Sequence, residues 1–187
     1  MKKYLTVVIL FTMSLAGCRT AKPVAELSKT GVGAAEKQAG TNYADPVTWL
    51  LGYINLIQFS GPPHSEWFMK GLNDYQPLPE VITRLANINK DEISIKVVLG
   101  TWCPDSRREV PRFMKIIDLL QFPQERMIFI GVDNTKMAPV GGYDTLGIER
   151  VPTFIFMKNK VEAGRIIENP VTSLEQDMLN ILTGNEK

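Results

Sequence analysis

The sequence predicts an α/β domain with a mixed sheet and helices on its faces, preceded by a helical segment. Two patterns support this. A strand-like run at Ile93–Leu99, an amphipathic run at roughly Pro104–Leu120 and an apolar run at Met127–Val132 form a strand–helix–strand unit with parallel strands. Two further strand-like runs, Thr153–Met157 and Val161–Ile167, flank a short turn and precede a last helix, which predicts an antiparallel hairpin followed by a helix.

The composition is that of a globular protein with no electrostatic reason to bind nucleic acid. The 187 residues leave room for one domain and an appendage, and 44% of them are apolar and 22% charged. A formal net charge of +1 provides no concentrated basic face for phosphates. The sequence also lacks a His/Cys cluster and a phosphate-binding glycine motif. We therefore expect no nucleic acid, no metal and no cofactor.

Residues 1–17 have the pattern of a signal peptide. Two lysines precede the apolar stretch Leu5–Leu15, which is too short to span a bilayer comfortably. The Leu-Ala-Gly-Cys that ends at Cys18 resembles the lipobox of bacterial lipoproteins, which are cleaved before the cysteine and lipidated on it. The resemblance implies location in the bacterial cell envelope, with a lipid on Cys18 as membrane anchor, facing the periplasm in a diderm cell. The alternative is an ordinary signal peptide that ends at a chance cysteine.

The rest of the chain divides into a tether and one domain. Residues 18–42 contain no aromatic residue and no sustained period, which predicts a flexible tether. The domain is expected at residues 43–187, with a helical extension at 43–90 and a core at 91–187.

The extension is predicted to consist of helices. Asp45-Pro46 supplies a good N-cap and first helical position, and apolar residues at helical spacing continue to Ile57. Ser60–Pro63 ends this helix. Two more helices are expected, at Glu66–Leu72 and from Pro79 onward.

Cys103 is the candidate nucleophile, because it lies where a strand gives way to a helix. Unpaired N–H groups and the helix dipole favour an anion there. Arg107 and Arg108 would act in the same direction if they point toward the sulfur, and Asp105 would oppose them. The hydroxyl of Ser106 could donate a hydrogen bond to the thiolate but cannot attack a disulfide.

These residues resemble the active site of the thioredoxin superfamily. Trp102–Ser106 is similar to its Trp-Cys-x-x-Cys motif with the second cysteine replaced, Pro111 matches the proline in its active-site helix, and Val151–Thr153 matches its cis-proline motif. The resemblance covers roughly residues 93–182. It implies a thioredoxin-like three-layer sandwich, a mixed central sheet with helices on both faces, to which the helical extension is added.

The resemblance also implies roles for individual residues. Those at the catalytic positions are Cys103 and Ser106, and those at the substrate-binding positions are Trp102, Pro104, Val151 and Pro152. The chain departs from the pattern at Ser106, where a resolving cysteine would stand, and at Val97, where thioredoxins often carry a buried acid. An external thiol would then have to resolve the mixed disulfide, as in monothiol glutaredoxin-like proteins. A similar Trp-Cys-x-Asp-Ser signature occurs in thioredoxin-like proteins of Bacteroidetes-type bacteria.

Two functions remain open at this point. With Cys18 acylated, Cys103 is the only thiol left, so no internal disulfide can form. The chain is either a monothiol thiol–disulfide exchange protein, whose partners are protein or peptide thiols and disulfides, or a redox-inactive module that binds a peptide or protein. A one-cysteine peroxidase is disfavoured because the motif around its cysteine is missing. The lone His64, beside two prolines, is expected in a solvated loop.

Overall fold

The structure, a computed structural model, describes residues 40–184. Its strands are β1 (Gly52–Ile54), β2 (Ile93–Leu99), β3 (Met127–Gly131), β4 (Thr153–Lys158) and β5 (Val161–Ile167). Its α-helices are α1 (Ser65–Asp74), α2 (Pro79–Ala86), α3 (Pro104–Leu119) and α4 (Leu174–Thr183). Short 3-10 turns are η1 (Pro46–Thr48), η2 (Leu56–Phe59), η3 (Lys90–Glu92), η4 (Gln124–Arg126) and η5 (Tyr143–Leu146).

The strands form one mixed sheet in the order β1-β3-β2-β4-β5. Strands β2 and β3 are parallel and joined through α3, as the strand–helix–strand pattern predicts. Strand β4 pairs antiparallel with both β2 and β5, and α4 follows β5, so the predicted hairpin and last helix are confirmed. The predicted α/β fold class is confirmed, and the βαβ unit followed by a ββα unit is a thioredoxin-like arrangement.

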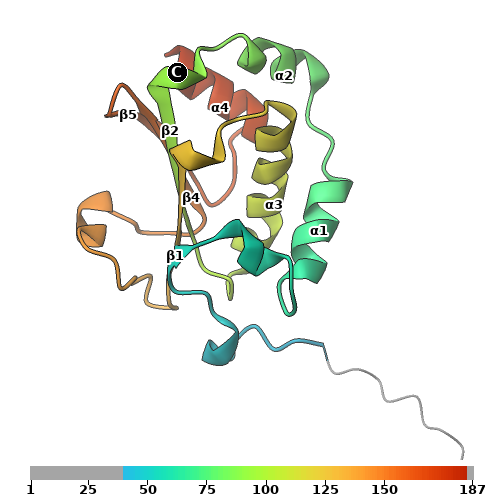
Figure 1. The fold of residues 1–187 in the computed structure, drawn as a ribbon, viewed down its shortest axis with the longest axis vertical. Helices are drawn as coiled ribbons and strands as arrows, with labels where there is room; N and C mark the ends of the chain where they lie inside the picture. The colour runs from blue at the N-terminus through green and yellow to red at the C-terminus, as the bar shows by residue number, and fades with distance from the viewer. Residues whose placement is uncertain (1–39, 185–187) are drawn as a thin grey trace, which may run out of the picture. The chain divides into compact units, whose positions relative to one another are not determined.

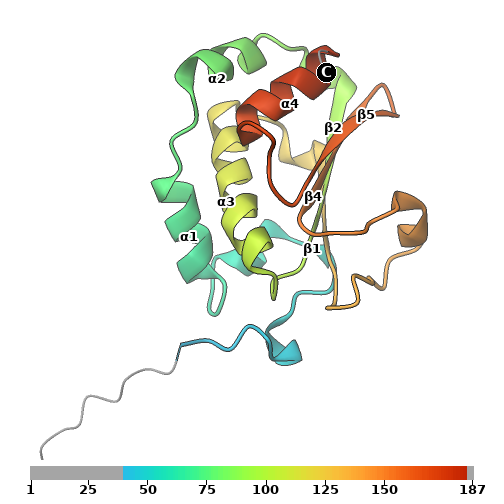
Figure 2. The same cartoon turned by 180° about the vertical axis from the view of Figure 1, so that it is seen from behind.

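The two faces of the sheet are covered by different layers. The four α-helices of the described residues lie on one face (Figure 1, Figure 2), where their apolar side chains pack with alternate strand residues such as Ile95, Val97 and Phe154. The other face packs against residues 132–150, whose regular structure is the turn η5. The prediction of helices on both faces is therefore wrong for the described residues, because this segment, which contains Pro139 and three glycines, forms loops and η5 where a helix was expected. Cys103 belongs to the smaller apolar cluster on this second face. The thiol therefore lies on the side of the sheet that a loop layer covers.

The predicted helix over Asp45–Ile57 is wrong. The turn η1, the strand β1 and the turn η2 occupy this stretch instead. Gly52 has a φ of +78°, which a continuous right-handed helix does not accommodate. Strand β1 also pairs antiparallel with β3, with Tyr53 opposite Ile130, so the sheet supplies hydrogen bonds that compete with a helix. The extension thus contributes an edge strand as well as helices α1 and α2, which match the other two predicted helices.

Helix α3, which carries the candidate site, is fixed by close contact with α1. Pro111 lies inside α3 and is buried against Gly71 of α1. A Cβ at Gly71 would lie 2.4 Å from Pro111 Cγ, so only glycine permits this approach. The contact sets the position of the helix whose first residues follow Cys103.

The N-terminal predictions fall outside the part of the chain that the structure describes. They are the signal peptide at residues 1–17, the lipidation of Cys18 and all but the last residues of the tether. Between residues 40 and 184, no helix combines the length and the apolar character that crossing a bilayer would require.

Candidate functional site

Cys103 is the N-cap residue of α3 and directly follows the turn after β2. Its side chain is 7% exposed. The Sγ–H donates to the carbonyl oxygen of Val151 at 3.3 Å, across from the loop that leads into β4. The Val151–Pro152 peptide bond is cis, as the motif predicts. The fold therefore brings together the cysteine and the proline motif, which lie about fifty residues apart in the sequence.

Ser106 is fully buried one turn into α3. Its Oγ accepts a hydrogen bond from the backbone N–H of Gly100 at 3.2 Å. Within residues 40–184 no hydrogen bond joins Ser106 to Cys103, so the predicted bond between its hydroxyl and the sulfur is absent from the resting site. The serine ties the end of β2 to the first turn of α3, and its role in this structure is to position the turn.

The other predicted site residues differ in how far they are buried around Cys103. Pro104 is exposed at the first position of α3, and Val151 and Pro152 are buried beside Cys103. Trp102 is half-buried, and its Nε1 donates to the carbonyl of Val132 at 3.0 Å. A Cβ at Gly100 would lie 2.5 Å from the Trp102 indole, so the ring folds back over the turn because the residue is glycine. The indole of Trp102 is thus held between the turn and the end of β3.

Arg107 and Arg108, in the first turns of α3, make their hydrogen bonds to groups other than the sulfur. Arg107 Nη1 donates to the carbonyls of Thr101, at 3.0 Å, and Trp102, at 2.7 Å. Arg108 forms ion pairs with Asp105 at 2.8 Å and with the buried Glu109 at 2.5 Å. Arg107 and Arg108 were expected to favour the thiolate if they point toward the sulfur. Their hydrogen bonds direct them to other groups instead.

A segment upstream of β1, residues 41–50, lies across this end of the domain. The backbone N–H of Leu50 donates to Thr101 Oγ1 at 3.1 Å. Trp49 Nε1 donates to the carbonyl of Tyr43 at 2.9 Å, and its ring lies 6.4 Å from that of Trp102, centroid to centroid. The segment is thus attached directly to the turn that leads into Cys103.

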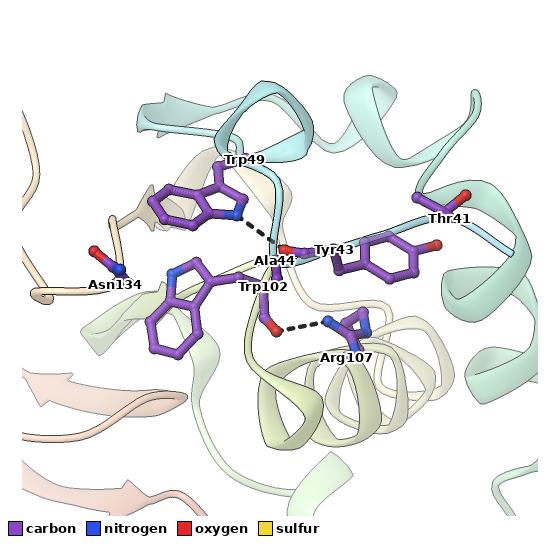
Figure 3. Close-up of a pocket in the computed structure, with 7 residues that line it drawn as sticks. All are labelled: Thr41, Tyr43, Ala44, Trp49, Trp102, Arg107 and Asn134. Atoms are coloured by element: carbon purple, nitrogen blue, oxygen red, sulfur yellow. Dashed lines mark hydrogen bonds between the residues drawn. The ribbon is translucent and has the colours of Figure 1, made fainter.

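This segment lines an open pocket of about 420 Å³ together with Trp102, Arg107 and Asn134. Figure 3 shows the indoles of Trp49 and Trp102 next to each other, with Arg107 beside the ring of Tyr43. The guanidinium carbon lies 4.3 Å from the centroid of that ring. The pocket adjoins Trp102, whose next neighbour in the chain is Cys103.

The prediction of a solvated His64 is wrong, because the residue is 3% exposed. Its ring packs against those of Tyr43, Phe59 and Trp67 at centroid distances of 5.9–6.4 Å. Its Nδ1 is buried without a hydrogen-bond partner in the described part of the chain. Burial, together with the positive charge of Arg107, lowers the pKa of His64 below its usual 6.5.

This lowered pKa predicts a loss of stability in mild acid. A histidine whose pKa is lower in the folded than in the unfolded chain stabilises the fold fully above the unfolded value of about 6.5, and that stabilisation is lost as the pH falls from 6.5 toward the folded value. We expect the free energy of unfolding to drop with a slope of up to about 1.4 kcal/mol per pH unit in that window.

Denaturant unfolding at pH 7.5 and pH 5.5 measures this slope. His64→Phe, which keeps a ring in the aromatic cluster, should show a shallower slope than the natural chain. His64 is the chain's only histidine, so the difference between the slopes isolates it from the carboxylates. Equal slopes in the two chains would contradict the prediction.

Between residues 40 and 184 no group of three or more His, Cys, Asp or Glu side chains could hold a metal ion. What the arrangement can do chemically rests on one thiol, a neighbouring backbone carbonyl and an adjacent aromatic pocket with an arginine.

Sequence patterns did not reveal the contribution of residues 41–50 and of Thr101. Thr101 is fully buried and binds Leu50, but a lone threonine before a tryptophan carries no recognisable signal. Tyr43 and Trp49 are recognisable in the sequence as aromatic residues near the start of the domain, but their contacts are not. Their contacts with Arg107 and Trp102 depend on the strand pairing of β1, which the helical spacing concealed.

Comparisons with known proteins add little beyond the fold. No family model and no curated protein matches the chain. A protein of unknown function from Pseudomonas aeruginosa is similar in structure, with 17% identity over 65% of this chain and 82% of that one and a TM-score of 0.46. Thioredoxin O2 from Arabidopsis thaliana, in its oxidised state, shows 21% identity over 53% of this chain and 84% of that one, with a TM-score of 0.34. An HIV epitope-scaffold gives 17% identity, coverages of 64% and 72%, and a TM-score of 0.38. The thioredoxin-like fold therefore rests on the strand order and the helix connections of the chain itself.

Proposed function

We propose that this chain is a lipid-anchored protein of the bacterial cell envelope that performs monothiol thiol–disulfide exchange through Cys103. The position of the Cys103 sulfur is the observation that supports it most. Sγ belongs to the N-cap residue of a sixteen-residue helix, whose dipole favours negative charge at that end, and it lies beside the Val151–Pro152 motif. Protein or peptide disulfides and thiols are the proposed partners.

The proposed reaction has two exchange steps. Cys103 loses its proton to solvent, and its thiolate attacks one sulfur of a partner disulfide. A new S–S bond joins Cys103 to the partner, the partner's own S–S bond breaks, and the departing thiolate takes up a proton. Because position 106 holds serine, an external thiolate must attack the partner sulfur of the mixed disulfide, which releases Cys103 as a thiolate.

A redox-inactive module that binds a peptide or protein is the second candidate. The burial of Cys103 favours it, since the residue is only 7% exposed and must become accessible before its sulfur can react with a partner disulfide. The hydrogen bond to Val151 also occupies the thiol proton in the resting structure.

Formation of a mixed disulfide distinguishes these candidates. We expect the folded full-length Cys18→Ala chain, in which Cys103 is the only thiol, to gain one adduct from hydroxyethyl disulfide, as read by intact mass. An added thiol should remove the adduct. The same chain with Cys103→Ser should gain none, and a folded Cys103 chain that stays unmodified would leave the redox-inactive module as the function.

The anchor is tested separately from the chemistry. We expect the natural chain to fractionate with bacterial membranes and to incorporate labelled fatty acid. Cys18→Ala should abolish the labelling. Labelling that persists in Cys18→Ala would overturn the lipoprotein assignment without bearing on Cys103.

A further inference from the structure

We infer that the pocket beside Trp102 binds a carboxylate of the partner peptide, held by the free edge of the Arg107 guanidinium between aromatic rings. This inference rests on the proposed function, because it assigns a substrate feature to the exchange site. It adds a specificity-determining residue, Arg107, to a site otherwise defined by Cys103 and the proline motif.

The hydrogen bonds of Arg107 leave one edge of its guanidinium unused. Nη1 has two hydrogens, and both are directed at carbonyls, those of Thr101 and Trp102. Nε and Nη2 have no hydrogen-bond partner within residues 40–184. These two nitrogens form the fork that binds a carboxylate through two parallel hydrogen bonds. The carbonyls thus fix the group in an orientation that keeps this fork available.

The charge of Arg107 is also uncompensated, which sets it apart from its neighbours. Arg108 is paired with Asp105 and Glu109, and Arg112 with Glu109. No carboxylate forms an ion pair with Arg107 in the described part of the chain. Its positive charge is instead placed against the Tyr43 ring at 4.3 Å. A partner carboxylate would supply the missing counter-charge in a partly desolvated setting, where such a pair is stronger than at an open surface.

The walls of the pocket indicate what carries the carboxylate. Tyr43, Trp49 and Trp102 are aromatic, and Arg107 is the only charged residue that lines the pocket among those described. Aromatic walls suit an apolar or aromatic group attached to the carboxylate better than a doubly charged, strongly hydrated phosphate. Trp102 lines the pocket and directly precedes Cys103 in the chain, so the pocket adjoins the turn that leads into Cys103. A carboxylate close to the partner's reactive cysteine fits this position, whether it belongs to an acidic side chain or to a chain end.

Two aromatic disulfide reagents, each with two six-membered rings joined by an S–S bond, test the inference in the full-length Cys18→Ala chain. One is 5,5′-dithiobis(2-nitrobenzoate), which carries a carboxylate on each aromatic ring, and the other is the uncharged 2,2′-dithiodipyridine. We expect Arg107→Gln to lower the rate with the first about tenfold relative to the second, a loss that corresponds to one charge-assisted interaction. Arg108→Gln, with the same change of charge one residue away, should leave the ratio unchanged. Arg107→Lys, which keeps the charge and loses the fork, should fall between.

The outcomes separate this inference from the proposed function. If both reagents react and Arg107→Gln leaves their ratio unchanged, or Arg108→Gln lowers it equally, the carboxylate site is overturned and the exchange chemistry stands. If neither reagent reacts, the exchange function fails, and binding is read instead by quenching of tryptophan fluorescence with free 2-nitrobenzoate in the Cys103→Ser chain. Quenching that Arg107→Gln weakens and Arg108→Gln does not would support the site; quenching equal in both, or none, would overturn it. Peptides with a glutamate or glutamine side chain, and with a free or amidated C-terminus, then distinguish the two carboxylate sources.

Discussion

Replacing Ser106 by cysteine should convert slow, externally driven release of a partner into rapid internal release. Residues three positions apart on one helix face lie about 5–6 Å from each other, so the introduced thiolate can attack Cys103 Sγ in the mixed disulfide. That attack closes an internal disulfide and expels the partner as a thiolate. An oriented internal nucleophile reaches effective concentrations far above those of a dissolved thiol. We expect Ser106→Cys to speed release on the order of 100-fold or more relative to about 1 mM external thiol.

Release is measured in the Cys18→Ala chain, in which a mixed disulfide between Cys103 and a small thiol is formed first. The concentration of small thiol set free is then followed over time. The unsubstituted chain should hold its adduct until a thiol is added. The substitution removes the bond from Gly100 N–H to the Ser106 hydroxyl, so a cost of about 1 kcal/mol in stability is expected and does not affect the comparison. An unsubstituted chain that releases the adduct unaided, or a Ser106→Cys chain that retains it, would contradict the two-step scheme.

Gly131→Ala should destabilise the domain by about 3–5 kcal/mol, because its extra methyl group meets backbone. A Cβ at Gly131 would lie 2.0 Å from the carbonyl oxygen of Leu50 and 2.8 Å from Ile54 Cδ1. Neither the end of β3 nor the segment that leads into β1 can move away without breaking the pairing between these strands. The same shift would withdraw Leu50 from Thr101 and loosen the segment that lines the pocket.

Equilibrium unfolding in denaturant measures this cost. Gly141→Ala is the matched control, since a Cβ there meets nothing within 4 Å, and its effect should stay within about 0.5 kcal/mol. If Gly131→Ala were as mild as Gly141→Ala, the close contact between β3 and the segment at residue 50 would be contradicted, and with it the position assigned to Trp49.

The core of the fold could be predicted because its patterns are local. The run Ile93–Leu99 is a strand with the predicted ends, and α3 begins at Pro104 as predicted, since proline fixes the first turn of a helix. The cysteine at the end of this strand and the Val151–Pro152 motif were each readable from neighbouring residues. Their meeting at 3.3 Å follows from the βαβ and ββα connections, which the order of elements already implied.

The parts that could not be predicted depend on contacts between distant segments. Apolar residues in Asp45–Ile57 recur at helical spacing, but β1 forms there because the edge of β3 is available and Gly52 allows a turn in the backbone. His64 follows two prolines, which favours a loop, and only the packing of Tyr43, Phe59 and Trp67 around it makes it buried. The direction of Arg107 is set by the carbonyls of the turn before its own helix, a geometry that sequence spacing does not specify.

The central claim is that Cys103 is a nucleophile in the folded chain. The most direct test compares its rate of reaction with a small neutral disulfide in the folded chain and in the same chain unfolded in denaturant. In the Cys18→Ala background the reaction reports one sulfur. If Cys103 is a nucleophile, activation of its thiol by the helix N-terminus should outweigh the slowing caused by burial, since the residue is 7% exposed. The folded chain should then react about tenfold faster than the unfolded chain. A folded chain that reacts more slowly than the unfolded one would contradict the claim and leave a thioredoxin-like module that binds its partner without exchanging a disulfide.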